Sequence, residues 1–334
     1  MNSLLEKIAV AVPRMGRLVP EYYRPVLKGC LTYFPGLYNL SKVVCPSPDS
    51  ARYYYSIWLR HLVMAAKNGL DTAPAAVAEL GPGGFLGVGL AALMSGADRY
   101  YALDAVPYIQ QNRNLEVFHE LVTLFNKREH IPNQEEFPEA KPTLDSYDFP
   151  NQILTDQRLE KAMDPARLRS IKESLDHSGL SDGRNARIVY IAPWNDAGVL
   201  GENSIDMIVS QAVLEHVASP SQVYWACYSW LKKGGIMSHQ IDYKSHGITR
   251  SWNGHWTYSN FLWRLIKGRR PYLLNREPHS VHLDLIRSCG FEVVCNLPIK
   301  GHSDIRRDQL EGKYKAISDD DIVTTGAFVQ AVKL

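Results

Sequence analysis

Two glycines and an acid in the first third of the chain have types and a spacing that could hold a ligand. The apolar run 75–80 favours a buried strand, Gly81 and Gly83 permit a tight turn of bare backbone, and residues 86–94 favour a helix. A second strand then ends at Asp104, about 20 residues beyond the turn, where a carboxylate can accept hydrogen bonds from a ribose diol. This pattern predicts a cofactor that carries a nucleoside.

An acid just before the glycine turn narrows the choice of cofactor. The segment 79–83, Glu-Leu-Gly-Pro-Gly, resembles motif I of the class I S-adenosylmethionine (SAM) methyltransferases, an acid-x-Gly-x-Gly loop around the methionyl part of the cofactor. Residues 204–217 are similar to the fourth strand of that family and the turn after it, and residues 231–236 are similar to the turn into its fifth strand. The resemblance covers residues 76–110 and 187–334.

The resemblance implies SAM as the cofactor and S-adenosylhomocysteine as the product formed from it. It also implies that the turn and the acid after the second strand bind this cofactor, through Glu79, Gly81, Gly83 and Asp104. The rival interpretation is an NAD-dependent oxidoreductase, because Gly-x-Gly-x-x-Gly loops bind dinucleotides. Leu86 stands where the third glycine of that loop belongs, which favours SAM.

Two further strand ends supply candidate cofactor contacts. Many class I methyltransferases have an acid after the third strand that meets the adenine amino group, so the resemblance implies a polar contact from Asn195 or Asp196 and a stacking face from Trp194. The predicted fourth strand ends at Ser210 and Gln211, at the edge where ligands of open α/β sheets bind. Gln211 is therefore expected to contact the cofactor.

Histidines near two strand ends could act as the base in a methyl transfer. Transfer from a sulfonium is an in-line displacement, and a hydroxyl acceptor must lose its proton, a task that suits a histidine. We expect His246 to be this base, with Asp242 as its orienting partner, because both lie near the carboxyl end of the predicted fifth strand. His216, in the turn after the fourth strand, is the alternative base. A metal site of His239, Asp242 and His246 would need an irregular backbone, so no metal is expected.

Aromatic and basic residues alternate in the segment 247–282. Aromatic faces beside cations suit a sugar ring that carries phosphate. The same composition equally suits a packed helical insertion with a solvated basic edge. The residues are Trp252, Trp256, Tyr258, Phe261, Trp263 and Tyr272, with Arg264, Lys267, Arg269, Arg270 and Arg276.

The composition is that of a cytoplasmic enzyme. Of 334 residues, 45% are hydrophobic and 22% charged, enough for a large core with elements beyond a single sheet domain. A formal net charge of +2 and the lack of basic repeats argue against bulk nucleic acid as a partner. Five cysteines without CxxC spacing indicate neither a disulfide framework nor zinc. The sequence has no apolar leader and no uncharged apolar run of about 18 residues, so no transmembrane segment is expected.

Two segments lie outside the predicted common core. They are a helical N-terminal extension, 1–75, and an insertion at about 111–186 within the SAM-binding domain 76–334. Residues 50–68 favour an amphipathic helix that leads into the first strand, and the insertion is either a lid or a passive elaboration. Residues 1–48 carry six Lys and Arg against two acids and could contact an anionic membrane surface, although a packed extension with solvated cations is favoured.

We therefore expect an α/β fold with a doubly wound, seven-stranded sheet, an antiparallel last strand, a helical N-terminal cap and an insertion. The expected function is SAM-dependent O-methylation of a small-molecule acceptor, similar to methyltransferases of surface-polysaccharide pathways, with a sugar or glycan precursor as the leading acceptor. N- or C-methylation is the first alternative, and a catalytically silent SAM-binding regulatory or scaffold subunit is the second. The sequence does not fix the oligomeric state.

Overall fold

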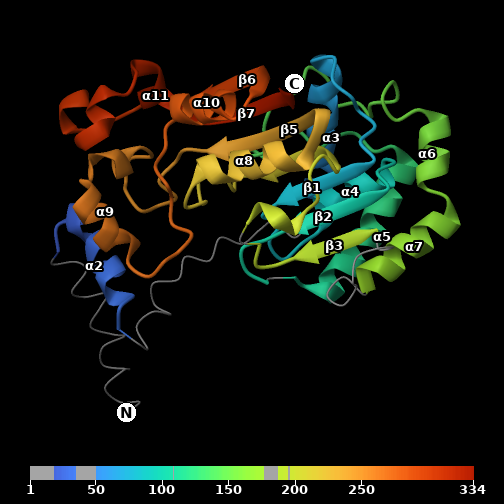
Figure 1. Ribbon diagram of the computed structural model, residues 1–334, viewed down its shortest axis with the longest axis horizontal. Coiled ribbons are helices and arrows are strands. Elements are labelled where there is room, and N and C mark those ends of the chain that lie inside the picture. Colours follow the sequence, from blue (N-terminus) through green and yellow to red (C-terminus); the bar gives the residue numbers. More distant parts are fainter. Residues whose placement is uncertain (1–18, 35–49, 108, 177–186, 195) are drawn as a thin grey trace, which may run out of the picture.

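The computed structural model centres on one seven-stranded sheet (Figure 1). It describes residues 19–34, 50–107, 109–176, 187–194 and 196–334. The strands are β1 (Ala76–Leu80), β2 (Arg99–Leu103), β3 (Ile188–Ile191), β4 (Ile205–Gln211), β5 (Leu231–Asp242), β6 (Phe291–Lys300) and β7 (Thr324–Lys333). Their order across the sheet is β3-β2-β1-β4-β5-β7-β6; β1 to β5 pair in parallel, and β7 runs antiparallel to both β5 and β6. The expected doubly wound α/β sheet with a reversed last strand is confirmed.

Helices cover both faces of this sheet. Alternate residues of a strand point to opposite faces, so Val77 of β1 packs in one apolar cluster and Ala78 in another. The first cluster contains α3 (Ala51–Lys67), α4 (Gly87–Met94), α5 (Gln111–Lys127), α6 (Asp156–Ala162) and α7 (Pro165–Asp176). The second contains α8 (Pro220–Trp230) and α10 (His279–Ser288). Because these strands are parallel, the carboxyl ends of β1, β2, β4 and β5 lie at one edge of the sheet.

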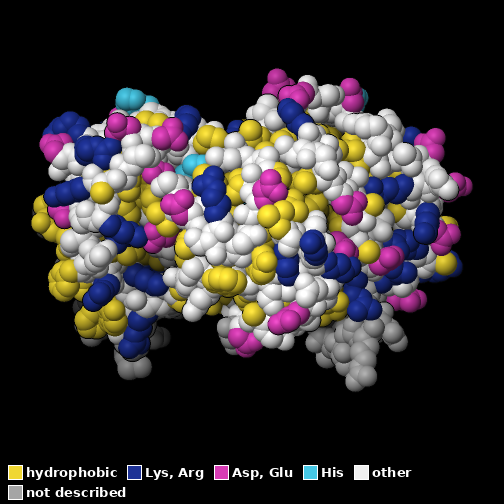
Figure 2. Space-filling view, turned by 45° about the horizontal axis from the view of Figure 1, so that its top comes forward, with side chains coloured by type: hydrophobic (Ala, Val, Ile, Leu, Met, Phe, Trp, Pro, Cys, Tyr) yellow, Lys and Arg dark blue, Asp and Glu magenta, His cyan; other side chains and the backbone are white. Residues whose placement is uncertain are grey.

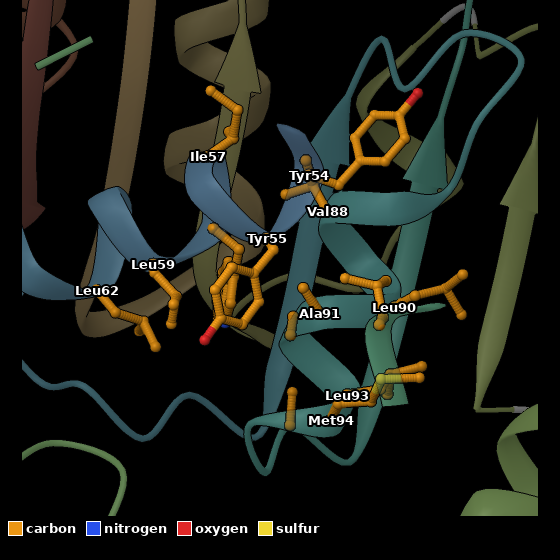
Figure 3. Packing of buried hydrophobic residues seen from close by; sticks show 14 of the residues in the cluster. Tyr54, Tyr55, Ile57, Leu59, Leu62, Val88, Leu90, Ala91, Leu93 and Met94 are labelled. Atoms are coloured by element: carbon orange, nitrogen blue, oxygen red, sulfur yellow. The ribbon is translucent and has the colours of Figure 1, made fainter. Parts of the chain in front are cut away.

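Helix α3 is buried around most of its circumference, whereas the sequence predicts a helix with one apolar face. Figure 3 shows its side chains, Tyr54 among them, packed beside those of α4. The ring of Tyr54 fills the space that a Cβ at Gly87 would occupy, so the two helices approach closely at that glycine. The far side of α3 is covered by the loop 128–155 between α5 and α6, to which Tyr55 and Ser56 donate hydrogen bonds. Because this loop covers the side of α3 that faces away from α4, the helix is buried on more than the one predicted apolar face.

A buried arginine fastens the same loop to α3. Arg60 has no exposed surface, and its guanidinium donates to the backbone oxygen of Pro132 at 2.8 Å and to that of Pro142. It also lies 5.2 Å from the ring centroid of Tyr147. None of the ion pairs among the described residues involves Arg60. A buried guanidinium needs hydrogen-bond acceptors, so these backbone oxygens hold the loop in place.

One glutamine joins this loop to the edge of the sheet. Gln240 of β5 accepts a hydrogen bond from the backbone N–H of Lys141 at 2.9 Å and donates to the backbone oxygen of Glu139 at 3.4 Å. The side chain of Gln211, at the end of β4, donates to the same Gln240 oxygen. The loop therefore reaches the carboxyl ends of β4 and β5.

A smaller lobe carries most of the aromatic segment 247–282 and stands at the left of Figure 1. It contains α2 (Arg24–Leu31) and α9 (Asn260–Lys267), with α11 (Asp319–Val323) above them. The rings of Trp256, Tyr258 and Trp263 are buried here, and the guanidinium of Arg276 lies 4.6 Å from the Trp263 ring centroid. These rings are not available to a sugar. The expectation of a sugar-binding face is corrected for these three rings, because all three are buried and the Trp263 ring faces a cation of the chain itself.

Candidate functional site

The glycine turn joins β1 to α4 at the carboxyl edge of the sheet. Gly81 has φ 65° and Gly83 has φ 68°, a left-handed conformation that favours glycine. A Cβ at Gly81 would stand 2.7 Å from the side chain of Val213, in the turn after β4. The backbone N–H of Gly83 donates to Oδ2 of Asp104 at 2.8 Å. The turn therefore contacts the residues that follow β2 and β4, the two strands on either side of β1.

Asp104 lies directly after β2 and is 6% exposed. Its Oδ1 accepts a hydrogen bond from the backbone N–H of Ala105 at 2.7 Å, while Oδ2 accepts from Gly83. Burial raises the pKa of Asp104 above its usual value, and the backbone donors oppose that rise. The backbone N–H of Val106 also donates to Oδ1, at 3.4 Å. These donors hold the carboxylate beside the turn, and Oδ2 keeps a lone pair that can accept a ribose hydroxyl.

Glu79 belongs to β1, and its side chain is buried beside β2. It is 5% exposed and accepts a hydrogen bond from the Tyr100 hydroxyl at 2.5 Å. Burial raises the pKa of Glu79 to about 8. The carboxyl group is therefore largely protonated at neutral pH, and it supports the strand before the glycine turn.

The buried Glu79 carboxyl should make stability fall with rising pH. Its pKa of about 8 in the folded state stands above its ordinary 4.5, so its ionisation costs the folded state more than the unfolded chain. The stabilisation is fully present below the ordinary value and is lost as pH rises through the folded-state value. Glu79→Gln is neutral at every pH, so the wild type should lose roughly 2 to 5 kcal/mol of unfolding free energy relative to this variant between about pH 5 and 9. Urea denaturation across that range measures it, and parallel pH profiles would contradict the assignment.

The candidate adenine contacts follow β3. The backbone N–H of Trp194 donates to the carbonyl oxygen of Asp104 at 3.0 Å, so the indole is attached next to the proposed ribose acceptor. That indole packs edge to face against Trp230, with ring centroids 5.5 Å apart. Asp196 accepts a hydrogen bond from the backbone N–H of Gly198 at 2.7 Å. Asn195 lies outside the described residues.

The two residues at the end of β4 point in different directions. The side-chain oxygen of Gln211 is buried and has no hydrogen-bond partner among the described residues, so it is an acceptor available to a ligand. Ser210 is 1% exposed, and its hydroxyl contacts Nδ1 of His239 at 2.8 Å. The expectation that Ser210 faces the sheet edge is therefore wrong, because the pleat turns it into the interior.

Two histidines and two carboxyl groups form a cluster at the carboxyl ends of β4 and β5. Nε2 of His246 lies 3.5 Å from Oδ2 of Asp242 and 4.0 Å from Oε1 of Glu215. The rings of His216 and His246 meet edge to face, with centroids 4.9 Å apart. His246 has φ 48°, which is uncommon for a residue with a side chain and indicates a constrained turn after β5. The structure thus brings together the three residues proposed from the sequence as catalytic, and it adds Glu215.

The carboxyl groups of the cluster differ in charge. Glu215 is 3% exposed, its carboxyl oxygens make no hydrogen bond within the described residues, and burial raises the pKa of this carboxyl group well above the usual range. Burial also acts to raise the pKa of Asp242, but hydrogen bonding to His246 and the charge of Lys244 bring it below its usual value. Burial lowers the pKa of His216, as does the nearby His246. An ionised Asp242 beside a neutral Glu215 can orient an imidazole and stabilise it once it is protonated.

Residues 268–278 form hydrogen bonds to this cluster and to the neighbouring strand ends. The backbone oxygen of Tyr272 accepts a hydrogen bond from Nδ1 of His216 at 2.9 Å, and its hydroxyl donates to the Ala105 oxygen at 3.3 Å. The side chain of Asn275 donates to the Leu214 oxygen at 2.7 Å. One segment thus links the turn after β4 to the residue that follows Asp104. The sequence shows no local pattern for these contacts, because each joins residues more than 50 positions apart.

Comparison with known proteins matches part of this chain. A family model described as a methyltransferase domain matches residues 172–238, which include β3, β4, α8 and the start of β5. The tRNA 5-carboxymethoxyuridine methyltransferase of Escherichia coli K12 is 35% identical over 77 residues, which are 23% of this chain and 28% of that relative. The chain therefore spans less than a third of the length of that relative. Its sheet has the strand order of the class I SAM-dependent methyltransferase fold, and the segment 172–238 matches a methyltransferase domain.

Two solved methyltransferases align with most of the chain at low sequence identity. A SAM-dependent methyltransferase from Mesorhizobium loti covers 81% of this chain and 96% of its own, with 11% identity and a TM-score of 0.40. Phosphoethanolamine N-methyltransferase 2 from Haemonchus contortus, solved with SAM, covers 84% and 56%, with 14% identity and a TM-score of 0.40. Scores this low give neither structure weight in the assignment.

The match to a methyltransferase domain favours SAM over NAD as the cofactor, because methyltransferases of this class take the methyl group from SAM. The matched segment begins at residue 172, so the glycine turn 79–83 and Asp104 lie outside it. Their roles in binding SAM remain predictions, supported by the left-handed turn and by the carboxylate that the Gly83 backbone holds beside it.

Three residues of the histidine–carboxylate cluster also carry side-chain atoms that divalent cations bind. One ligand atom from each of Glu215, His216 and His246 lies within 4.8 Å of the others, and the described residues contain no second group of this kind. Ligands about 2.1 Å from a tetrahedral zinc ion stand roughly 3.4 Å apart, so the cluster would have to contract to hold one. The site of His239, Asp242 and His246 is not formed, because His239 is fully buried against Ser210.

Metal removal provides a direct test of how the cluster acts. If His246 works as a free base, dialysis of the protein against EDTA should leave its turnover unchanged. Metal analysis of the dialysed protein serves as the control. Loss of turnover that zinc or manganese restores would make Glu215, His216 and His246 metal ligands instead.

Proposed function

We propose that this enzyme transfers the methyl group of SAM to a hydroxyl oxygen of a small molecule, with His246 as the base. The position of the histidine–carboxylate cluster carries this proposal. His246 lies beside Asp242 at the end of β5, on the sheet edge that also holds the glycine turn and Asp104. Ligands of open α/β sheets bind at that edge, so donor and acceptor would meet beside a proton acceptor.

The chemistry of the step matches the charges of the cluster. The hydroxyl oxygen attacks the methyl carbon in line with the sulfur, the sulfur–methyl bond breaks, and the hydroxyl proton passes to His246. The products are the methyl ether, S-adenosylhomocysteine and an imidazolium. Asp242 stabilises this imidazolium, because its lowered pKa keeps it ionised beside Nε2.

The acceptor is best defined by its reacting group. A sugar or glycan precursor remains one candidate, supported by the general likeness to methyltransferases of surface-polysaccharide pathways. The buried rings of Trp256, Tyr258 and Trp263 give that candidate no support. A nucleoside in RNA is the second candidate, supported by the short match to a tRNA methyltransferase.

A product screen tests the proposal. The enzyme is incubated with SAM labelled in its methyl group and with a panel of sugars, nucleotide-linked sugars, phenols, amines and tRNA. We expect a hydroxyl compound to gain one labelled methyl in exchange for its proton. Methylation confined to amines, or to the base of a nucleoside, would overturn O-methylation. Stabilisation by S-adenosylhomocysteine in a thermal shift assay shows that the protein in the screen binds its cofactor.

A further inference from the structure

Helices α2 and α9 form one face of the smaller lobe, which we call the α2–α9 face and define as residues 19–34 and 259–272. Figure 2 shows hydrophobic and basic side chains interspersed on this lobe, at the left of the view. The two segments are far apart in the sequence but pack directly. A Cβ at Gly29 would overlap the backbone oxygens of Leu265 and Ile266, so the helix backbones touch. The backbone N–H of Arg269 also donates to the Thr32 hydroxyl at 2.8 Å.

Exposed aromatic side chains are concentrated on the α2–α9 face. Nine large hydrophobic side chains are exposed in the described part of the chain, and six of them belong to this face. Phe261 is 68% exposed and Phe34 is 58% exposed. The other four are Tyr22, Tyr23, Tyr33 and Tyr272. A cluster of this kind on a folded protein marks a contact surface rather than incidental exposure.

The same face is strongly cationic. Its two segments contain six basic residues and one acid, Glu21, although the whole chain has a net charge of only +2. The basic residues are Arg24, Lys28, Arg264, Lys267, Arg269 and Arg270. No described carboxylate forms an ion pair with Lys28, Arg264 or Lys267, so their charge is not neutralised locally. Such a face attracts a surface of negative charge.

We propose that the α2–α9 face docks the enzyme on an anionic phospholipid membrane. Phenyl rings such as those of Phe34 and Phe261 have no hydrogen-bonding edge and suit the acyl boundary of a bilayer, where tyrosines lie at headgroup level and cations pair with anionic lipid. No described helix has both the length and the apolar character to cross a bilayer, so this contact is peripheral. It does not depend on the methyl acceptor, and it would place the active site beside a membrane.

Vesicle sedimentation with the full chain tests this inference. Binding is measured to phosphatidylcholine vesicles with and without phosphatidylserine, in the absence of SAM and acceptor. We expect binding only with phosphatidylserine, and weaker binding as salt rises to about 0.5 M. Phe34→Ser with Phe261→Ser, and separately Arg264→Glu with Lys267→Glu, should each weaken binding about tenfold or more.

Matched controls come from elsewhere on the surface. Trp225→Ser removes a 56% exposed ring from α8, and Lys127→Glu with Lys161→Glu reverses two exposed charges at the ends of α5 and α6. Both controls should bind like the wild type. Equal loss in test and control variants, or no binding to phosphatidylserine, would overturn the proposal. Binding of labelled tRNA that the face variants abolish, without vesicle binding, would make the face an RNA surface. Failure here leaves O-methylation untouched, because the screen above uses soluble acceptors.

Discussion

Replacing His246 with alanine is expected to lower turnover by about 10² to 10⁴-fold while SAM affinity stays nearly unchanged. The base acts on the proton of the acceptor in the transition state and is not proposed to touch the cofactor. Because His246 has a left-handed backbone, His246→Asn is the better matched variant, since asparagine tolerates this conformation. Single-turnover kinetics at saturating SAM, with calorimetry for SAM binding, measure both quantities.

His216→Ala separates the two candidate bases. His216 lies beside His246, but burial lowers the pKa of His216, so it should be the weaker proton acceptor. If His216→Ala abolishes turnover while His246→Asn retains it, with both proteins folded, the base moves to the turn after β4. If neither substitution matters, the acceptor needs no base, as with an amine, and O-methylation loses its support.

Asp104→Ala should weaken SAM binding by about 10 to 150-fold, which corresponds to roughly 1.5 to 3 kcal/mol. The substitution removes the proposed ribose acceptor and also frees the Gly83 backbone N–H that it holds. Turnover at saturating SAM should change far less than affinity, because the carboxylate is not expected to contact the reacting atoms. Calorimetric titration with S-adenosylhomocysteine measures the loss.

Two variants control for indirect effects on the glycine turn. Asp104→Asn keeps an acceptor oxygen beside Gly83 and should lose less affinity than the alanine variant. Asp145→Ala removes an 82% exposed carboxylate that pairs with Lys67 and should bind the cofactor normally. Unchanged affinity in a folded Asp104→Ala protein would rule out the ribose role.

The elements that position the cofactor could be predicted from the sequence because their signals are local. The glycine turn lies between an apolar strand and a helix. β1 and α4 begin and end within about two residues of the sequence-based ranges, and β2 ends one residue before the predicted Asp104. The proximity of His246, Asp242 and His216 followed from strand order, because parallel strands present their carboxyl ends at one edge. Their roles in the reaction remain predictions.

The other features of the site and of the smaller lobe depend on contacts between residues that are far apart in the sequence, which no local pattern encodes. Composition alone could not decide whether the aromatic segment packs or binds a sugar, and Arg276 decides it by entering between Trp263 and Tyr314. Nothing in the sequence around Glu215 indicates that this residue is buried beside His246. The α2–α9 pairing depends on a backbone contact at Gly29, which joins residues more than 200 positions apart.

The buried guanidinium of Arg60 makes the stability of this protein depend on the loop between α5 and α6. A shortened chain without residues 131–147 would leave a cation in the interior with its backbone acceptors removed, and an unsatisfied buried charge costs several kcal/mol. Arg60 and the loop must therefore be gained or lost together. Relatives that carry a short connection here should have an apolar residue in place of this arginine, so its presence would mark, from sequence alone, which of them share the loop.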